Sequence, residues 1–351
     1  MNYRHIKKFA LLAAIILSAV VSHFSGGWNQ YHLLIIITIG INIVLAVSLN
    51  LINGYTGQFS LGHAGFMAIG AYVSAYLSTE YGANFLRLFG GHAGALAIAL
   101  LFLGVLILGG IAAAVAGLIV GVPSLRLKGD YLAIVTLGFG EIIRVIIQNT
   151  DAVGGARGYS GIANYTTLFW TFALAAVTIY VVVSLIDSTY GRGFLTVRDD
   201  EIAAEAVGIN TTRYKVVAFV LGAFFAGIAG GLYAHINNSI NPQGFDFQVS
   251  ILIVTMVILG GMGSTPGVVL AAVVLTLLPE FLRWFAKSDL LDWLVRHAYQ
   301  FLSPEHFAVA AAKTKELFES RMILFSILLI ALMLLRPQGL FGALPRRKAS
   351  R

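Results

Sequence analysis

Long apolar runs recur along this chain of 351 residues and constrain its fold more than any other feature. The chain is 58% hydrophobic and 11% charged, whereas soluble proteins are about 45–50% apolar and about 25% charged. Runs of about 17 or more apolar residues are long enough to cross a bilayer. We therefore predict an all-α, polytopic membrane bundle of about ten transmembrane helices in a single domain over 1–351, with spans near 9–24, 33–52, 60–78, 94–120, 131–147, 168–186, 214–236, 246–262, 267–285 and 321–335.

The first apolar run, Phe9 to Val21, follows Arg4, Lys7 and Lys8 and so resembles a signal peptide in charge and length. Its downstream flank, SHFSGGWNQ, contains no clear small-x-small cleavage site. We expect this run to be retained as the first membrane helix.

The positions of the basic residues indicate an orientation. The loops 25–32, 148–167 and 237–245 carry only Arg157, whereas three basic clusters fall on the opposite side: Arg126 with Lys128; Arg192, Arg198, Arg213 and Lys215; and the tail from Arg336 to Arg351. The exceptions are Arg87, near 79–93, and the segment 286–320, in which four basic residues are balanced by five acidic ones. The positive-inside rule then predicts that both termini are cytoplasmic. The same rule explains the net charge of +7 better than a nucleic-acid partner does. The segment 286–320 is predicted to be an extracytoplasmic loop with surface helices.

Two glycine-rich breaks interrupt apolar sequence, NGYTGQFSLGHAG from Asn53 to Gly65 and GGMGSTPG from Gly260 to Gly267. Irregular backbone at membrane depth is tolerated only where it is buried in protein or lines a wet cavity. One hypothesis is that the breaks border a translocation path, with Asn53, Gln58, His63 and Gly261 as candidate lining residues. The alternative is a pair of tight turns at the membrane surface.

Charged residues inside the predicted spans are few. Glu141 with Arg144, and Glu280 with Arg283, are three residues apart, and we expect each to form an ion pair on a helix face near an interface.

A polar segment at 187–215, DSTYGRGFLTVRDDEIAAEAVGINTTRYK, lies between two long apolar runs. Asp199 and Asp200 are suited to cap a short helix, which Gly208 then ends. Along that helix, Ile202, Ala206 and Ile209 would form an apolar stripe, with Glu201 and Glu205 on the other side. Small side chains allow another surface to approach closely, so we interpret the helix as a docking element. An amphipathic connector on the membrane surface is the alternative.

Several kinds of chemistry have no sequence signature here. The chain has no G-x-x-x-x-G-K-[ST] phosphate loop, no H-E-x-x-H helix and no G-x-S-x-G turn. Its eight histidines lack metal-binding spacing, and it has no cysteine. We therefore expect no enzymatic activity, no catalytic residue, no cofactor and no metal, and an energy source, if there is one, on another chain.

Four stretches together resemble a known family, the LivM-like permease subunits of ABC importers for branched-chain amino acids. They are SLNLINGYTGQFSLGHAGFMAIGAY at 48–72, VPSLRLKGDYLAIVTLGFGEIIRVIIQN at 122–149, RDDEIAAEAVGINTTRYKVVAFVLGAFFAGIAGGLYA at 198–234 and MILFSILLIALMLLRPQGLFG at 322–342. The resemblance implies a subunit in a bacterial cytoplasmic membrane, within lipid, that works with two cytoplasmic ATP-binding subunits, a homologous second permease and a soluble substrate-binding protein.

The resemblance also implies that the polar segment couples to the ATPase through an EAA-like motif. The implied coupling residues are Asp199, Asp200, Glu201, Ile202, Ala203, Ala204, Glu205 and Gly208. Here Ile202 stands where the motif has glutamate. The sequence departs further from the family at Ala156-Arg157 and in the length of 286–320. Permeases for urea, amides or other amino acids have similar sequences, so the substrate stays open. An ion-coupled secondary transporter and a scaffold subunit remain alternative functions.

Overall fold

The computed structural model describes residues 3–88, 94–124 and 130–286, with a few isolated positions beyond them. The described chain is almost entirely helical, and its elements follow in this order: α1 (Tyr3–Phe24), η1 (Ser25–Gly27), α2 (Gln30–Asn53), α3 (His63–Tyr76), η2 (Leu77–Tyr81), α4 (Gly82–Leu88), α5 (Ala95–Ser124), α6 (Asp130–Gln148), η3 (Asp151–Val153), η4 (Gly155–Arg157), β1 (Tyr159–Ser160), α7 (Leu168–Ile186), α8 (Thr189–Asp199), α9 (Glu201–Ala206), α10 (Thr211–Asn237), β2 (Ser239–Ile240), η5 (Pro242–Phe245), α11 (Phe247–Gly260) and α12 (Thr265–Ala286).

Eight helical segments of the described chain are long and apolar enough to cross a membrane. They correspond to eight of the ten predicted spans and confirm the all-α membrane bundle. The predicted span 60–78 starts as a helix only at His63, and this helix continues from α3 through the π-helical segment η2 into α4, which ends at Leu88. It is not among the eight segments. The predicted span 321–335 and the loop 286–320 lie almost wholly outside the described residues.

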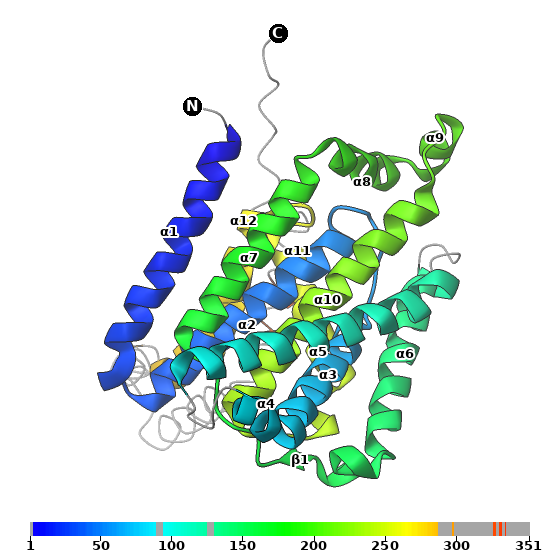
Figure 1. Cartoon of the computed structure of the whole chain (residues 1–351). Coiled ribbons are helices and arrows are strands. Elements are labelled where there is room, and N and C mark those ends of the chain that lie inside the picture. Colours follow the sequence, from blue (N-terminus) through cyan, green and yellow to red (C-terminus); the bar gives the residue numbers. More distant parts are fainter. Residues whose placement is uncertain are drawn as a thin grey trace.

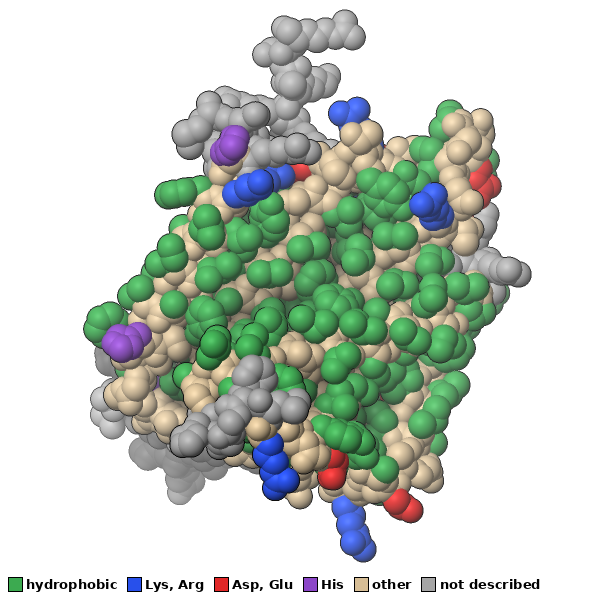
Figure 2. All heavy atoms as spheres, in the orientation of Figure 1, with side chains coloured by type: hydrophobic (Ala, Val, Ile, Leu, Met, Phe, Trp, Pro, Cys, Tyr) green, Lys and Arg blue, Asp and Glu red, His purple; other side chains and the backbone are tan. Residues whose placement is uncertain are grey.

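The long helices run between two polar ends (Figure 1). The start of α1, together with α8 and α9, lies at one end, which we call the α8–α9 end. The opposite, hairpin end carries the antiparallel pair β1–β2, in which Tyr159 pairs with Ile240. Figure 2 shows a broad band of hydrophobic side chains between ends that bear charged ones, as expected for a protein surrounded by lipid.

The centre of the bundle is α10, which packs against α5, α3 and α2. Glycines allow these helices to approach closely. A methyl group added at Gly230 would lie 1.9 Å from the carbonyl oxygen of Met67, and one at Gly70 would lie 2.1 Å from that of Gly227. Backbone therefore packs on backbone here, as in many membrane helix pairs.

Both predicted ion pairs form. Arg144 Nη2 lies 2.6 Å from Glu141 Oε2, and Arg283 Nη1 lies 3.3 Å from Glu280 Oε2. The second pair also engages the hydroxyl of Tyr31, which donates to Glu280 and accepts from Arg283.

Candidate functional site

The helix α8 lies across the α8–α9 end of the bundle and leads to α9 (Figure 1). Ser188 caps it, because its hydroxyl oxygen accepts from the backbone N–H of Gly191 at 3.1 Å. Phe194 is fully buried, and Tyr190 stacks on Tyr214 of α10 with ring centroids 4.5 Å apart. These aromatic contacts fix α8 to the start of α10.

Asp200 joins α8 to α9. Its extended backbone ends α8, and its carboxylate accepts from the N–H groups of Ile202 (2.9 Å) and Ala203 (3.0 Å) at the start of α9. The expectation that Asp199 caps the same helix is wrong. Asp199 is the last residue of α8, and its carboxylate accepts from Arg198 instead.

One side of α9 is held to the protein by polar contacts. Glu201 Oε1 lies 2.6 Å from Lys215 Nζ, and Glu205 Oε1 accepts from the hydroxyl of Thr211 at 2.7 Å. Ala204 is fully buried between these contacts. The two glutamates therefore share one side of the helix, as predicted, and that side faces α10.

The opposite side of α9 is apolar and exposed. Ile202 and Val207 are each 74% exposed, and Ala203 and Ala206 are exposed beside them. We call these four residues the apolar tip. Ile209, the third member of the predicted stripe, is half-buried. The α9 helix stands out from the bundle (Figure 1), so the apolar tip has no covering element among the described residues.

Gly208 ends the segment with a positive φ of +85°, and a methyl group added there would meet nothing within 4 Å. Its conformation, rather than the space around it, therefore requires glycine.

The first glycine-rich break is more than a surface turn. After α2 ends, residues 54–62 run back into the bundle. The imidazole of His63 bonds to the hydroxyl of Ser48 at 2.8 Å, and Ser48 lies five residues, or about 7.5 Å, before the end of α2. The start of α3 is therefore well inside the bundle.

The candidate path-lining residues are buried within this chain. Asn53 and Gln58 are each 4% exposed and His63 is fully buried. All three carry buried polar atoms without a hydrogen-bond partner in the described structure: Asn53 Nδ2, both amide atoms of Gln58 and His63 Nδ1. Gly261, also buried, ends α11 at φ +90° in the other break, so only the first three lie on one segment.

The two glycine-rich breaks meet each other, which the sequence did not reveal. The side-chain oxygen of Asn50, near the end of α2, accepts from the N–H of Gly263 at 2.9 Å. The hydroxyls of Tyr55 and Thr265 are 2.8 Å apart. Arg198 of α8 reaches the same place, with Nη1 3.5 Å from the carbonyl oxygen of Gly54. A basic residue in the last turn of a helix was the only sequence signal for this contact.

The hairpin end contains a polar cleft of about 780 Å³. Asp151 and Arg157 bring opposite charges to it, beside Gln148, Tyr159 and Asn241. Burial raises the pKa of the Tyr159 hydroxyl, which donates to Glu80 at 3.2 Å. The cleft is thus lined by neutral donors and acceptors as well as by one charge of each sign.

Within the described residues no group of three His, Asp or Glu side chains is placed to hold a metal. The fold and the site together define a multi-pass helical membrane protein that presents a small, polar-anchored helix with an exposed apolar tip at one end and a cleft at the other.

The chain belongs to the family described as the permease component of branched-chain amino acid transport systems, whose profile matches residues 31–335. It is 37% identical over 287 residues to the high-affinity branched-chain amino acid transport system permease protein LivM of Salmonella typhimurium, and 36% identical to LivM of Escherichia coli. Each alignment covers 72% of this chain but 63% of the relative, so the chain spans less than two thirds of their length.

A second group of relatives is more distant. The permease protein LivH of Escherichia coli is 26% identical over 271 residues, which cover 71% of this chain and 84% of LivH. No solved structure matches the chain significantly. The relatives agree with the expectation of a permease component in an inner membrane.

Proposed function

We propose that this chain is the permease subunit of an ATP-driven importer that moves branched-chain or related amino acids across the cytoplasmic membrane. The observation that carries the proposal is the short helix α9, whose apolar tip is exposed on one side and whose Glu201 and Glu205 tie it to α10 on the other. A connector on the membrane surface, which is the alternative, would lie beside the bundle with its apolar side against lipid, whereas α9 stands out beyond the end of the bundle (Figure 1). An exposed apolar side in that place is suited to a groove on a partner.

The coupling residues divide into two groups in this proposal. Ile202 and Ala203 of the apolar tip contact the ATPase, while Asp200, Glu201 and Glu205 hold α9 in place, Ala204 packs beneath it and Gly208 ends it. Asp199 orients Arg198. ATP-driven closure of two cytoplasmic ATP-binding subunits would then displace α9, and with it α8 and the attached spans, to favour one of two conformations.

The orientation follows from the basic residues. Arg192, Arg198, Arg213 and Lys215 lie at the α8–α9 end, which is therefore the cytoplasmic side, together with the amino terminus. The hairpin end then faces outward. Its cleft, with Asp151 and Arg157, is where a soluble substrate-binding protein would dock.

The expected second permease is a homologue. Two permease proteins, LivM and LivH, are named for the high-affinity branched-chain amino acid transport system of Escherichia coli, and both resemble this chain. Substrate selection would rest with the binding protein, because tight binding along the path would slow release. Urea, amides and other amino acids remain alternative substrates.

The test is purification of this chain from its native membrane in mild detergent, with identification of the copurifying chains and an assay of ATP hydrolysis. We expect two ATPases, a second permease, and hydrolysis that a loaded binding protein stimulates. Ligand binding to that protein then identifies the substrate. A chain that purifies alone and takes up substrate on an ion gradient would replace the proposal with a secondary transporter.

A further inference from the structure

The proposed function does not by itself assign a role to the Arg198 side chain. It is the penultimate residue of α8, immediately before the two residues that turn the chain into α9. Its side chain is 37% exposed, and Nε and Nη2 both donate to Asp199 Oδ1, at 3.0 and 2.8 Å. Asp199 therefore holds the guanidinium in one orientation, leaving Nη1 directed toward the carbonyl oxygen of Gly54.

The Arg198 side chain contacts both glycine-rich breaks. Nη1 lies 3.5 Å from the carbonyl oxygen of Gly54. A methyl group added at Gly57 would lie 3.1 Å from Arg198 Cγ, and one at Gly263 would lie 3.0 Å from Arg198 Nη1. Arg198 approaches both positions closely because neither carries a side chain. Both also have positive φ, +70° and +82°, which glycine adopts without strain.

Four helices begin or end at these two breaks. The first joins α2 to α3, and the second joins α11 to α12. Asn50 and the Tyr55–Thr265 pair tie the breaks directly to each other. A displacement of Arg198 therefore acts on the ends of all four helices through short contacts, without passing along the length of a helix.

We propose that Arg198 is the positioning residue through which the docking segment α8–α9 moves the two glycine-rich breaks, with Asp199 fixing its orientation. This inference rests on the proposed function, because it assumes that a partner displaces α9. In the resting state Arg198 keeps residues 54–57 and 261–264 together. When the partner moves α9, Arg198 carries that motion to the breaks and lets them separate at the cytoplasmic side.

The first test measures coupling in the assembled transporter in vesicles, as substrate taken up per ATP hydrolysed. Arg198→Ala should lower this ratio several-fold while hydrolysis continues, because the side chain that joins α8 to both breaks is lost. Arg198→Lys should give an intermediate ratio, because lysine keeps the aliphatic stem and the charge. Its ammonium group lacks the planar set of donors with which a guanidinium contacts Asp199 and Gly54 at the same time. Loss of assembly would instead lower both rates together.

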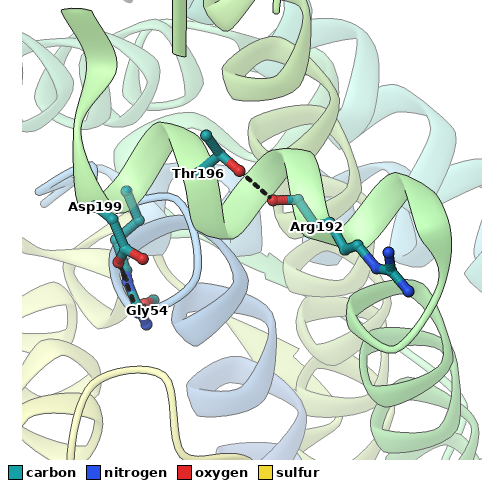
Figure 3. Close-up of polar contacts among 5 residues, drawn as sticks. Gly54, Arg192, Thr196 and Asp199 are labelled. Carbon is teal, nitrogen blue, oxygen red and sulfur yellow. Dashed lines mark hydrogen bonds and ion pairs between the residues drawn. The ribbon is translucent and has the colours of Figure 1, made fainter. Parts of the chain in front are cut away.

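Arg192 provides the matched control. It lies on the same helix, is exposed, and contributes only its backbone carbonyl, which accepts from Thr196 (Figure 3). Arg192→Ala removes the same charge from α8 and should leave the ratio unchanged.

The second test needs no transport. The chain has no cysteine, and Thr56, in the first break, is 2% exposed and bonds only to the carbonyl oxygen of Ile52 among the described residues, so Thr56→Cys is a single, hidden reporter of whether the breaks stay together. Without nucleotide, we expect a thiol reagent to label it several-fold faster when Arg198→Ala is added, and no faster with Arg192→Ala.

The two tests separate the inference from the proposed function. Equal labelling in the Arg198→Ala and Arg192→Ala backgrounds, or an unchanged uptake per ATP in Arg198→Ala, would overturn the role of Arg198. If the unsubstituted assembly carries out no ATP-driven uptake but labelling still depends on Arg198, the proposed function fails and the contact between α8 and the breaks stands.

Discussion

The central helices and the docking segment use glycine in opposite ways. Gly230 of α10 lies where even a methyl group would collide with the backbone of α3, at 1.9 Å from Met67 O. Gly208, after α9, has open space around it and a positive φ of +85°. Glycine is required at Gly230 because there is no room for a side chain, and at Gly208 because the backbone has a positive φ. A substitution should therefore damage assembly at the centre but only local geometry at the docking segment.

The largest effect is expected at the centre. Gly230→Val would force α3 and α10 apart, at a cost above about 3 kcal/mol, since overpacking of a close-packed interior typically costs about 1–3 kcal/mol even against movable side chains. The amount of chain recovered from membranes in mild detergent, and its melting temperature, should both fall sharply. Normal recovery would show that α3 and α10 do not pack as closely as described.

A bulky residue at Gly208 should spare insertion and abolish transport. Gly208→Val places a β-branched residue at positive φ, which costs roughly 1–2 kcal/mol and tilts α9 away from its position. ATPase copurification and ATP-driven uptake should both be lost while membrane levels stay normal. Gly208→Asn is the control, because asparagine tolerates this conformation. Preserved uptake in the valine variant would contradict the docking role of α9.

Asp200→Ala should have a smaller effect. It removes both capping bonds of α9 and costs about 1 kcal/mol, which matters because a helix of six residues is not stable alone. We expect weaker ATPase binding in a titration and near-normal binding for Asp200→Asn, which keeps the acceptor. Equal weakening by both variants would indicate that the charge of Asp200, and not the cap, is what matters.

The smallest effect is expected at Gly104, and it sharpens the comparison within one helix. Gly104 and Gly109 both lie in α5, but an added methyl group meets nothing within 4 Å at Gly104 and lies 2.8 Å from Gly70 O at Gly109. Gly104→Ala should keep or slightly raise the melting temperature, whereas Gly109→Ala should lower it. A loss from Gly104→Ala would point to a surface there that another chain covers.

The sequence predicted the parts that follow from local chemistry. Apolar length identified eight of the membrane helices, and charge spacing identified the Glu141–Arg144 pair. The carboxylate followed by alanines predicted α9 and its polar side. The predicted cap included Asp199 as well as Asp200, because two adjacent carboxylates are equivalent until the direction of the chain between α8 and α9 is known.

Other parts depend on contacts between distant segments, which composition and spacing do not encode. The meeting of Asn50 with Gly263 joins residues that are far apart in sequence. The depth of His63 depends on how far residues 54–62 turn back along α2. Among 38 glycines, the sequence alone could not distinguish Gly230 from Gly104, because the neighbour that fills the space belongs to another helix.

The length of α8 has a consequence for insertions and deletions. The helix has 11 residues, starts at a serine cap and ends beside the glycine-rich breaks. Adding or removing one residue would rotate everything after it by about 100°, which would turn Arg198 away from Gly54. Natural variation in chain length should therefore be absent from 188–200. Sequences of related permeases can be screened for this property before any of them is purified.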